Sequence, residues 1–317
     1  MSDKNNSCAF RTSIGGQALI EGILMRGPKK QAIVCRTKDG IVEKTEELTP
    51  MKEKYPILSR PFLRGTLIFI DSMVKGMKAL TYSAELQPAE AQDEPDPIDR
   101  WITEHFSEEK AQKLIIGVAV VLGVALAVFL FIFLPALVVG FIPALKTSYL
   151  VRNLSEGLVR VAILLGYMKL VTLSGDVKRL FSYHGAEHKT IFCYEHGKPL
   201  TVENVRPESR FHPRCGTSFL LVVVVVSILV NALVRQDNTF ARMGCHLLLL
   251  PVVVGISYEI NRWCGGHDNL LSAVLSAPGK WLQKLTTNEP DDSMIECAIR
   301  AMELVIPEEK GSDDWLR

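Results

Sequence analysis

Hydrophobic residues gather in long uninterrupted runs in the middle of the chain. No charged residue occurs from Leu114 to Leu145, a run of 32 residues, or from Gly216 to Val234, a run of 19. A helix rises about 1.5 Å per residue, so about 20 apolar residues cross the hydrocarbon core of a bilayer. Pro135 and Pro143 lie in the first run and predict a kink or a short exit helix there. The pattern predicts an integral membrane protein and excludes a purely soluble enzyme.

Two weaker apolar stretches bring the expected number of spans to about four. The stretch from Leu158 to Ser174 contains Arg160 and Lys169, whose long side chains can reach the interface or face protein. The stretch from Met243 to Tyr258 is short for a crossing and contains Pro251.

The N-terminal portion has a different pattern. Residues 31–36 and 41–44 are strand-like and flank Asp39-Gly40, a strong hairpin signal, whereas the glycine-rich residues 12–30 read mostly as loop. Residues 62–86 predict an amphipathic helix that lies on a membrane or packs on the hairpin. The expected fold is a mainly α, polytopic helical membrane protein with a small N-terminal α+β cytoplasmic portion that contains a β-hairpin.

The domain organisation follows from these elements and from charge. We expect an N-terminal portion over 1–86, an acidic linker over 87–113, a membrane domain over 114–285 with a polar loop at 175–215, and a C-terminal tail over 286–317. The loop at 175–215 carries seven Lys and Arg residues, whereas the loops at 146–156 and 235–242 carry two each. Basic loops stay in the cytoplasm, so we expect both termini and the 175–215 loop on the cytoplasmic side.

The most reactive side chains lie in this polar loop. His184 and His188 are four residues apart, so a helix would place both imidazoles on one face. With Glu187 they form H-x-x-E-H, the pattern in which the inverzincin metalloproteases hold zinc through the histidines and activate water with the glutamate. The other interpretation of this segment is a hydrogen-bonded polar helix near the membrane surface.

Further metal-binding side chains follow in the sequence. His212 and Cys215 directly precede the third apolar stretch, and Glu259 follows the fourth. Tetrahedral zinc takes three protein ligands and a water in a catalytic site, or four in a structural one. We therefore predict a divalent metal, zinc, bound by His184 and His188 with one of His212, Cys215 or Glu259, and Glu187 as general base.

Other features carry less chemistry. The Gly15-Gly16 pair is interpreted as a structural turn, and His246 as a hydrogen-bonded histidine at the membrane interface. Seven scattered cysteines without a C-x-x-C pair favour a reducing compartment over a disulfide framework. A net charge of +1 gives no reason to expect direct DNA binding.

Five segments together resemble one family, the YqhQ-like bacterial membrane proteins. These segments are GGQALIEGILMRGP (15–28), RPFLRG (60–65), SYHGAEHKTIFCYE (182–195), FHPRCGTSFL (211–220) and LPVVVGISYEINR (250–262). The family is described as containing predicted metal-dependent enzymes. The resemblance implies a cytoplasmic N-terminal portion, several spans, and a site drawn from His184, Glu187, His188, His212, Cys215 and Glu259.

Two functions are consistent with these features. In the first, a zinc site at the cytoplasmic membrane boundary hydrolyses a peptide or a lipid-linked substrate. In the second, the chain is a non-enzymatic membrane anchor or adaptor, whose basic N-terminal portion recruits a cytoplasmic assembly such as the ribosome or another part of the translation machinery. The apolar stretches show no inverted repeat, which disfavours a transporter. Membrane lipid is an expected partner in each case.

Overall fold

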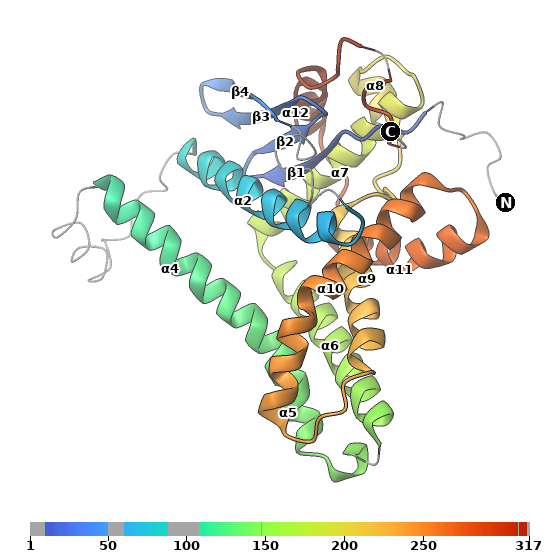
Figure 1. Ribbon diagram of the computed structural model, residues 1–317. Helices are drawn as coiled ribbons and strands as arrows, with labels where there is room; N and C mark the ends of the chain where they lie inside the picture. The colour runs from blue at the N-terminus through green and yellow to red at the C-terminus, as the bar shows by residue number, and fades with distance from the viewer. Residues whose placement is uncertain (1–9, 50–59, 88–107, 147, 310, 316–317) are drawn as a thin grey trace. The chain divides into compact units, whose positions relative to one another are not determined.

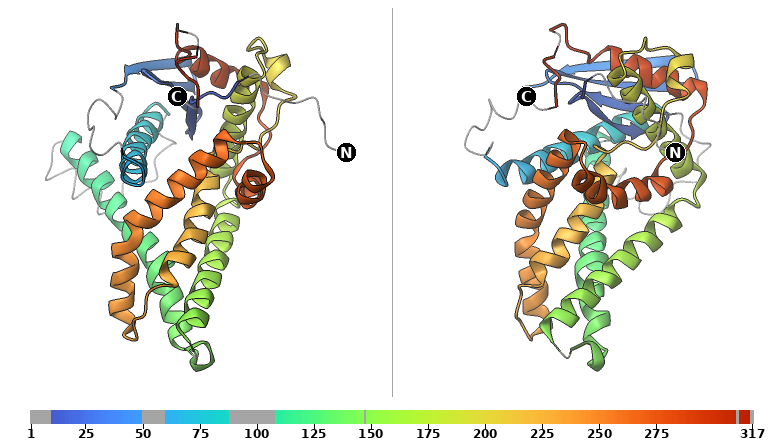
Figure 2. Two further views of the ribbon diagram at one scale, coloured as in Figure 1. Left: turned by 45° about the vertical axis from the view of Figure 1, so that its right-hand side comes forward. Right: turned by 90° about the vertical axis from the view of Figure 1, so that its right-hand side faces the viewer.

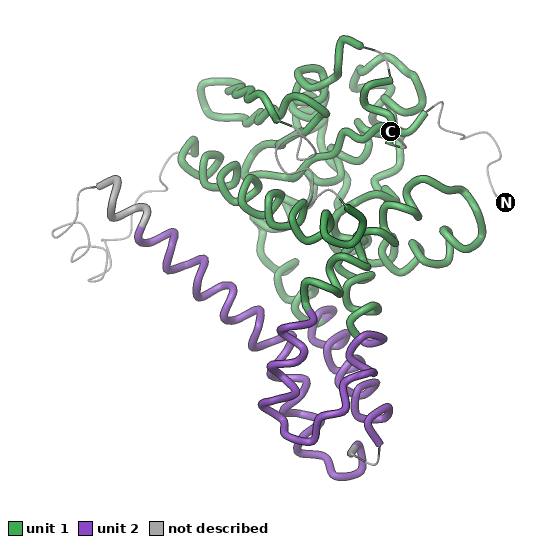
Figure 3. The backbone as a smooth tube through the Cα atoms, viewed as in Figure 1, with its two compact units in different colours: residues 1–87, 166–227, 250–317 green, residues 88–165, 228–249 purple. Residues whose placement is uncertain are grey.

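The structure, a computed structural model, describes residues 10–49, 60–87, 108–146, 148–309 and 311–315. It divides into two compact units (Figure 3): unit 1 comprises residues 1–87, 166–227 and 250–317, and unit 2 comprises residues 88–165 and 228–249. Most of the acidic linker predicted over 87–113 lies outside the described residues.

Unit 1 contains a four-stranded antiparallel sheet with its strands in sequence order (Figure 1). The strands are β1 (Gly15–Leu19), β2 (Gly22–Arg26), β3 (Lys30–Thr37) and β4 (Gly40–Glu47). The predicted hairpin is confirmed as β3 and β4, with Gly40 at a φ of 127° that favours glycine. The expectation of mostly loop over 12–30 is wrong, because β1 and β2 pair there around a two-residue turn in which Glu21 adopts a φ of 50°.

Helices bury both faces of the central strands β2 and β3. Side chains of one face, including Ile23 and Val34, form a core with α7 (Gly175–Glu195) and α12 (Asp292–Glu303). Side chains of the other face, including Leu24 and Ile33, pack against Ala79 of α2 (Leu63–Glu85). The predicted amphipathic helix over 62–86 is thus present and packs on the sheet. Strand β3 lacks polar alternation because neighbouring residues both face a core.

The C-terminal region differs from the expected tail over 286–317. Helix α12 has Asp291 as its N-cap, whose carboxylate accepts a hydrogen bond from the Met294 amide at 2.9 Å. Ile295, Ala298 and Met302 are fully buried at helical spacing in the core with the sheet. The helix and the sheet lie side by side in Figures 1 and 2. The apolar repeat of this short helix, not its terminal position, determines its burial.

The polar segment at 175–215 is largely helical instead of a loop. Helix α7 covers its first half, and α8 (Val202–Val205) follows, capped by the Thr201 side chain. The second half of helix α7, from Tyr183 to Glu195, is largely buried, and all seven residues from Gly185 to Ile191 are buried. This rigid helix holds the H-x-x-E-H segment.

Three longer helices include the remaining apolar stretches: α6 (Tyr149–Val171), α9 (Gly216–Asn231) and α10 (Thr239–Gly266). Residues Leu114–Gly140 and helix α10 are each long and apolar enough to cross a membrane, and the pair of α6 and α7, bent by 102°, would be a third candidate. Helix α9 has only 16 residues. The described residues therefore supply two or three candidate spans instead of the four expected. The stretch predicted over Met243–Tyr258 is part of a longer helix, α10, which has 28 residues.

Unit 2 contains the predicted kink. Helix α4 (Glu108–Val128) leads into a π-helical turn at Phe129–Phe133 and then into α5 (Leu134–Gly140). Pro135 has no N–H and leaves the carbonyl of Phe131 without its helical partner. The guanidinium of Arg160 on α6 donates to that carbonyl at 2.7 Å. A side chain of a second helix thus stabilises the break.

Candidate metal centre

Helix α7 aligns two histidines and a glutamate in successive turns. His184 and His188 are one turn apart, and their ring centroids are 4.4 Å from each other. His188 and Glu187 are buried, with 1% and 5% of their surfaces exposed. The prediction that a helix would bring the two imidazoles onto one face is thus confirmed.

The backbone fixes both imidazoles in the same tautomer. Nδ1 of His184 lies 2.8 Å from the carbonyl oxygen of Thr286, and Nδ1 of His188 lies 2.5 Å from that of Arg210. A carbonyl oxygen can only accept, so each Nδ1 carries the proton and donates it. Each neutral ring then offers the lone pair of Nε2, which is how metal-binding histidines are usually oriented.

Cys215 completes the group from the N-terminal side of α9. Its Sγ lies 3.1 Å from Nε2 of His184. Among the described residues, His184, His188 and Cys215 form a group whose potential ligand atoms all lie within 4.8 Å of one another. Nε2 of His188 is buried and has no hydrogen-bond partner. A buried, unpartnered lone pair beside a second imidazole and a thiol fits a divalent metal, and nitrogen with sulfur ligands suits zinc.

The electrostatics of the group favour the thiolate that a metal requires. Burial opposes ionisation of Cys215, but the adjacent imidazoles of His184 and His188 outweigh it and hold the pKa of the thiol well below its ordinary value. Burial lowers the pKa of His184, and the Cys215 thiolate outweighs this effect and raises that pKa to about 9. Without a metal, the proton of the thiol therefore lies on His184, and the two side chains form a thiolate–imidazolium ion pair.

Glu187 points its carboxylate at the first strand of the sheet. Its Oε1 accepts a hydrogen bond from the Gly16 amide at 2.9 Å, while its Oε2 is buried without a partner. Burial raises the pKa of Glu187, and the neighbouring histidines counteract only part of the increase. The result is a carboxylate with one fixed oxygen and one free oxygen beside His184 and His188.

Gly16 has a role that the sequence interpretation missed. The Gly15-Gly16 pair lies in β1 and does not form a turn. A Cβ on Gly16 would approach the Leu24 carbonyl oxygen to 2.5 Å and Cδ of Glu187 to 3.1 Å, whereas a Cβ on Gly15 would meet nothing within 4 Å. The glycine at 16 therefore permits close approach of the strand to the carboxylate.

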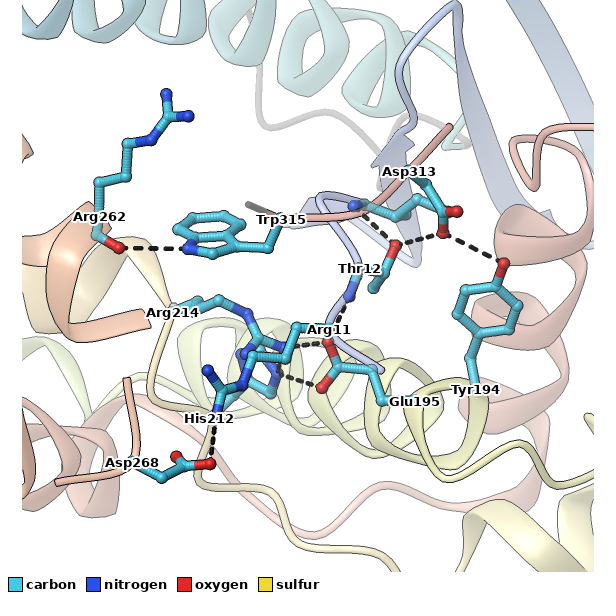
Figure 4. A network of polar contacts seen from close by, with 11 residues as sticks. Arg11, Thr12, Tyr194, Glu195, His212, Arg214, Arg262, Asp268, Asp313 and Trp315 are labelled. Carbon is cyan, nitrogen blue, oxygen red and sulfur yellow. Dashed lines mark hydrogen bonds and ion pairs between the residues drawn. The ribbon is translucent and has the colours of Figure 1, made fainter. Parts of the chain in front are cut away.

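His212 lies behind the group and is not part of it. Its ring centroid is 5.6 Å from that of His188. Its Nε2 lies 3.6 Å from Oε2 of Glu195, which is fully buried and also paired with Arg214 (Figure 4). Gln283 of α11 (Leu270–Thr286) accepts from the His212 amide and donates to its carbonyl. Burial lowers the pKa of His212 to about 4, so the ring is neutral.

The Glu195 network also fixes both ends of the described chain. The amide of Thr12 donates to Glu195, and the Thr12 hydroxyl donates to Asp313 at 2.7 Å (Figure 4). The hydroxyl of Tyr194 donates to the same Asp313 carboxylate. Nothing in the sequence pattern indicated this network, because its members are up to 301 residues apart.

Glu259 is held elsewhere. Arg64 donates to both of its carboxylate oxygens, Nε to Oε1 at 2.7 Å and Nη2 to Oε2 at 2.5 Å, and the Phe62 amide donates to Oε1 as well. The structure thus brings together His184, His188 and Cys215 with Glu187 beside them, and it does not bring His212 or Glu259 into the same group of ligand atoms.

Comparison with known proteins identifies a family. The family described as "Protein of unknown function (DUF1385)" matches residues 60–308. The protein described as "Uncharacterized protein YqhQ" from Bacillus subtilis (strain 168) is 33% identical over 294 residues, which cover 90% of each chain. No solved structure matches the chain at a significant level.

Proposed function

The chain belongs to the DUF1385 family, and from its site we propose a membrane protein that binds one zinc ion through His184, His188 and Cys215. The observation that carries the proposal is the orientation of the two imidazoles. Both Nδ1 atoms donate to backbone carbonyls, and both Nε2 atoms lie beside a thiol whose pKa is depressed. In a helix with a purely structural role, a buried Nε2 is expected to have a hydrogen-bond partner.

We propose that Glu187 acts as a general base in hydrolysis of a peptide or a lipid-linked substrate. When bound, the zinc ion would supply Lewis-acid activation of water or of a carbonyl or phosphoryl oxygen. Glu187 holds one oxygen on the Gly16 amide, and its free Oε2 can accept a proton. Burial raises its pKa above the ordinary value of a glutamate, which is the direction that strengthens a carboxylate as a base.

The backbone partners would keep this arrangement in place during the reaction. The carbonyls of Thr286 and Arg210 prevent the imidazoles from rotating, and Gln283 fixes the backbone at His212, three residues before Cys215. Such partners of metal ligands commonly affect metal affinity about 10- to 100-fold. Hydrogen bonds from the surrounding backbone and from Gln283 therefore hold the proposed ligands in place, which is typical of a metal site and not of a chance cluster.

A membrane location is the second part of the proposal. In the window that defines the span Leu114–Gly140, only 6% of the residues are buried. Val121 and Leu122 expose 67% and 63% of their surfaces, and lipid is the solvent that suits such a helix. We propose that both termini and helix α7 lie on the cytoplasmic side, as the Lys and Arg distribution favours.

Metal content tests the site directly. Detergent-purified protein should contain about one equivalent of zinc by mass spectrometry, and the His184→Ala/His188→Ala variant should contain none. The matched control is His267→Ala, because this histidine is exposed and hydrogen-bonded to the Trp263 carbonyl. Wild-type protein that remains metal-free after zinc is supplied would overturn the proposal.

Glu187→Gln separates catalysis from structure. It should retain zinc and yet abolish function in a complementation assay, because the amide cannot accept the proton. Full function in this variant would remove the enzymatic part of the proposal and leave a structural metal site, as in the adaptor interpretation.

A further inference from the structure

A second buried polar cluster lies in unit 2, in a region that the sequence interpretation divided between the loops at 146–156 and 235–242 and the spans that follow them. We call it the arginine cluster, and its members are Arg152, Asn153, Glu156 and Arg160 on α6 with Arg242 and His246 on α10. All six are buried, and Arg242 has no exposed surface. Charged side chains inside apolar helices are rare and mark functional sites.

The charges of this cluster are not balanced. Arg242 donates to Oε1 of Glu156 through Nε and Nη2, each at 2.9 Å. Nε of Arg152 is 3.6 Å from the same oxygen. Two guanidinium groups thus share one carboxylate oxygen. Asp237, whose backbone carbonyl accepts from Arg152, is exposed, and its carboxylate accepts from Tyr149. A buried excess of positive charge is costly without a counterion.

The cluster also has more hydrogen-bond donors than acceptors. Nη1 of Arg242, Nε of Arg152 and Nδ2 of Asn153 are all buried without a hydrogen-bond partner. Neither ring nitrogen of His246 has a partner, so the expected satisfied histidine is not observed. A buried N–H group without an acceptor costs the full desolvation of that group. A neutral imidazole contributes one donor and one acceptor, so the excess of donors comes from Arg242, Arg152 and Asn153. Two of these three donors belong to positively charged groups, and the partner that they lack is therefore an acceptor with negative charge.

Two helix N-termini add to the positive potential. Helix α6 begins at Tyr149 and α10 at Thr239, so Arg152 and Arg242 are each the fourth residue of a long helix. Nη2 of Arg152 donates to the Thr239 hydroxyl at 3.3 Å, which places the two N-termini next to each other. The N-terminus of a helix carries a partial positive charge and attracts anions.

From these observations we propose that the arginine cluster binds a phosphate group, with Arg152 and Arg242 as its principal contacts. Guanidinium groups match the oxygens of phosphate with paired, charge-assisted hydrogen bonds. Arg242 is about 5 Å along α10 from the start of this candidate span. Headgroup phosphates lie at the ends of spans, so a phospholipid and free phosphate are the two sources that the test separates.

The test uses delipidated full-length protein in detergent and three probes. Inorganic phosphate is titrated calorimetrically. Phosphatidylglycerol is compared with diacylglycerol by native mass spectrometry, because these lipids can share their acyl chains and differ in the phosphoglycerol headgroup. Retention of phosphatidylglycerol alone identifies a lipid headgroup site, and saturable binding of inorganic phosphate as well identifies a site for the phosphate group itself. Binding of neither phosphate probe above diacylglycerol overturns the proposal.

Variants locate the site within the protein. Arg152→Gln leaves the Arg242–Glu156 pair intact and should lower phosphate affinity about tenfold or more, the effect of a lost charge-assisted hydrogen bond. The control is Arg235→Gln, since Arg235 is an exposed arginine of the same unit, and it should bind like wild type. Equal affinity in the two variants would contradict the assignment. If Arg152→Gln is not monodisperse, Arg152→Lys, which retains the charge without the planar fork, provides the comparison.

Discussion

The metal centre of unit 1 and the arginine cluster of unit 2 are both buried and polar, but they lack opposite kinds of partner. In the metal centre the unpartnered atoms, Nε2 of His188 and Oε2 of Glu187, are acceptors. In the arginine cluster the unpartnered side-chain atoms of Arg242, Arg152 and Asn153 are donors. Acceptors without donors suit a cation, and donors without acceptors suit an anion. The sign of the missing charge can thus be read from hydrogen bonding before any ligand is known.

The largest effect should come from separating the buried ion pair of the arginine cluster. Arg242→Leu removes both hydrogen bonds that Glu156 accepts from Arg242 and leaves its buried carboxylate with only Nε of Arg152, 3.6 Å away, so we expect a loss of about 3–5 kcal/mol in the free energy of unfolding. Arg242→Leu/Glu156→Leu removes both members of this pair and should recover part of that loss, because Arg152 then loses its carboxylate. Chemical denaturation in mixed micelles measures both. A double variant as unstable as the single one would show that the pair is not the cause.

A smaller but specific effect is expected at the metal centre. Cys215→Ala removes one of three ligands, so zinc affinity should fall by more than about 100-fold, the upper limit for loss of a supporting partner. Cys193→Ala is the matched control, because Cys193 is also buried but its thiol lies near the Pro199 carbonyl, outside the group. Competition with a fluorescent chelator measures both affinities. Similar affinities would exclude Cys215 as a ligand.

These two regions also show what sequence reasoning can reach. The H-x-x-E-H spacing predicted the pairing of His184 and His188 because a helix has a fixed period. The same local logic predicted the α2 helix and the β3–β4 hairpin. It could not choose among His212, Cys215 and Glu259, since that choice depends on how α9, α10 and α7 pack. The structure groups Cys215 with the histidines and pairs Glu259 with Arg64.

Other features depended on tertiary contacts with no local signature. The sequence interpretation left open whether Arg160 reaches the membrane interface or faces protein. Its guanidinium faces protein and donates to the carbonyl of Phe131, which Pro135 leaves without its helical partner. Strands β1 and β2 were missed because glycines at 15, 16 and 22 lower strand propensity. At position 16 glycine is required because a Cβ would lie 2.5 Å from the Leu24 carbonyl oxygen and 3.1 Å from Cδ of Glu187.

A matched pair of glycine variants measures that requirement. Gly16→Ala places a methyl group 2.5 Å from the Leu24 carbonyl and against Glu187, so it should destabilise the protein by about 1–3 kcal/mol. It should also impair complementation if Glu187 is the general base. Gly15→Ala, which meets nothing within 4 Å, should change stability by less than about 0.5 kcal/mol. Equal effects would indicate that strand propensity, not the carboxylate, selects glycine.

Reporter fusions test the proposed membrane topology. Fusions after Leu200 and Phe240 flank α9 and should report opposite sides if this 16-residue helix crosses the membrane. If both fusions report the same side, α9 does not cross, and only Leu114–Gly140, α10 and the bent α6–α7 pair remain as candidate spans. If they report opposite sides, the four-span arrangement predicts that a fusion after Arg317 reports the same side as the fusion after Leu200.

The smallest effect should come from an exposed ion pair with the same chemistry as the buried one. Arg206 donates to both carboxylate oxygens of Asp292, at 3.1 and 2.6 Å, as a guanidinium fork, and more than half of each side chain is exposed. Water solvates both charges when the pair is broken, so Arg206→Leu should cause no measurable change in the free energy of unfolding. A change as large as that of Arg242→Leu would show that pairing itself stabilises these arginines. A larger loss of stability in Arg242→Leu than in Arg206→Leu would show that burial of the charges causes the loss. Burial is also the reason why the arginine cluster requires an anion.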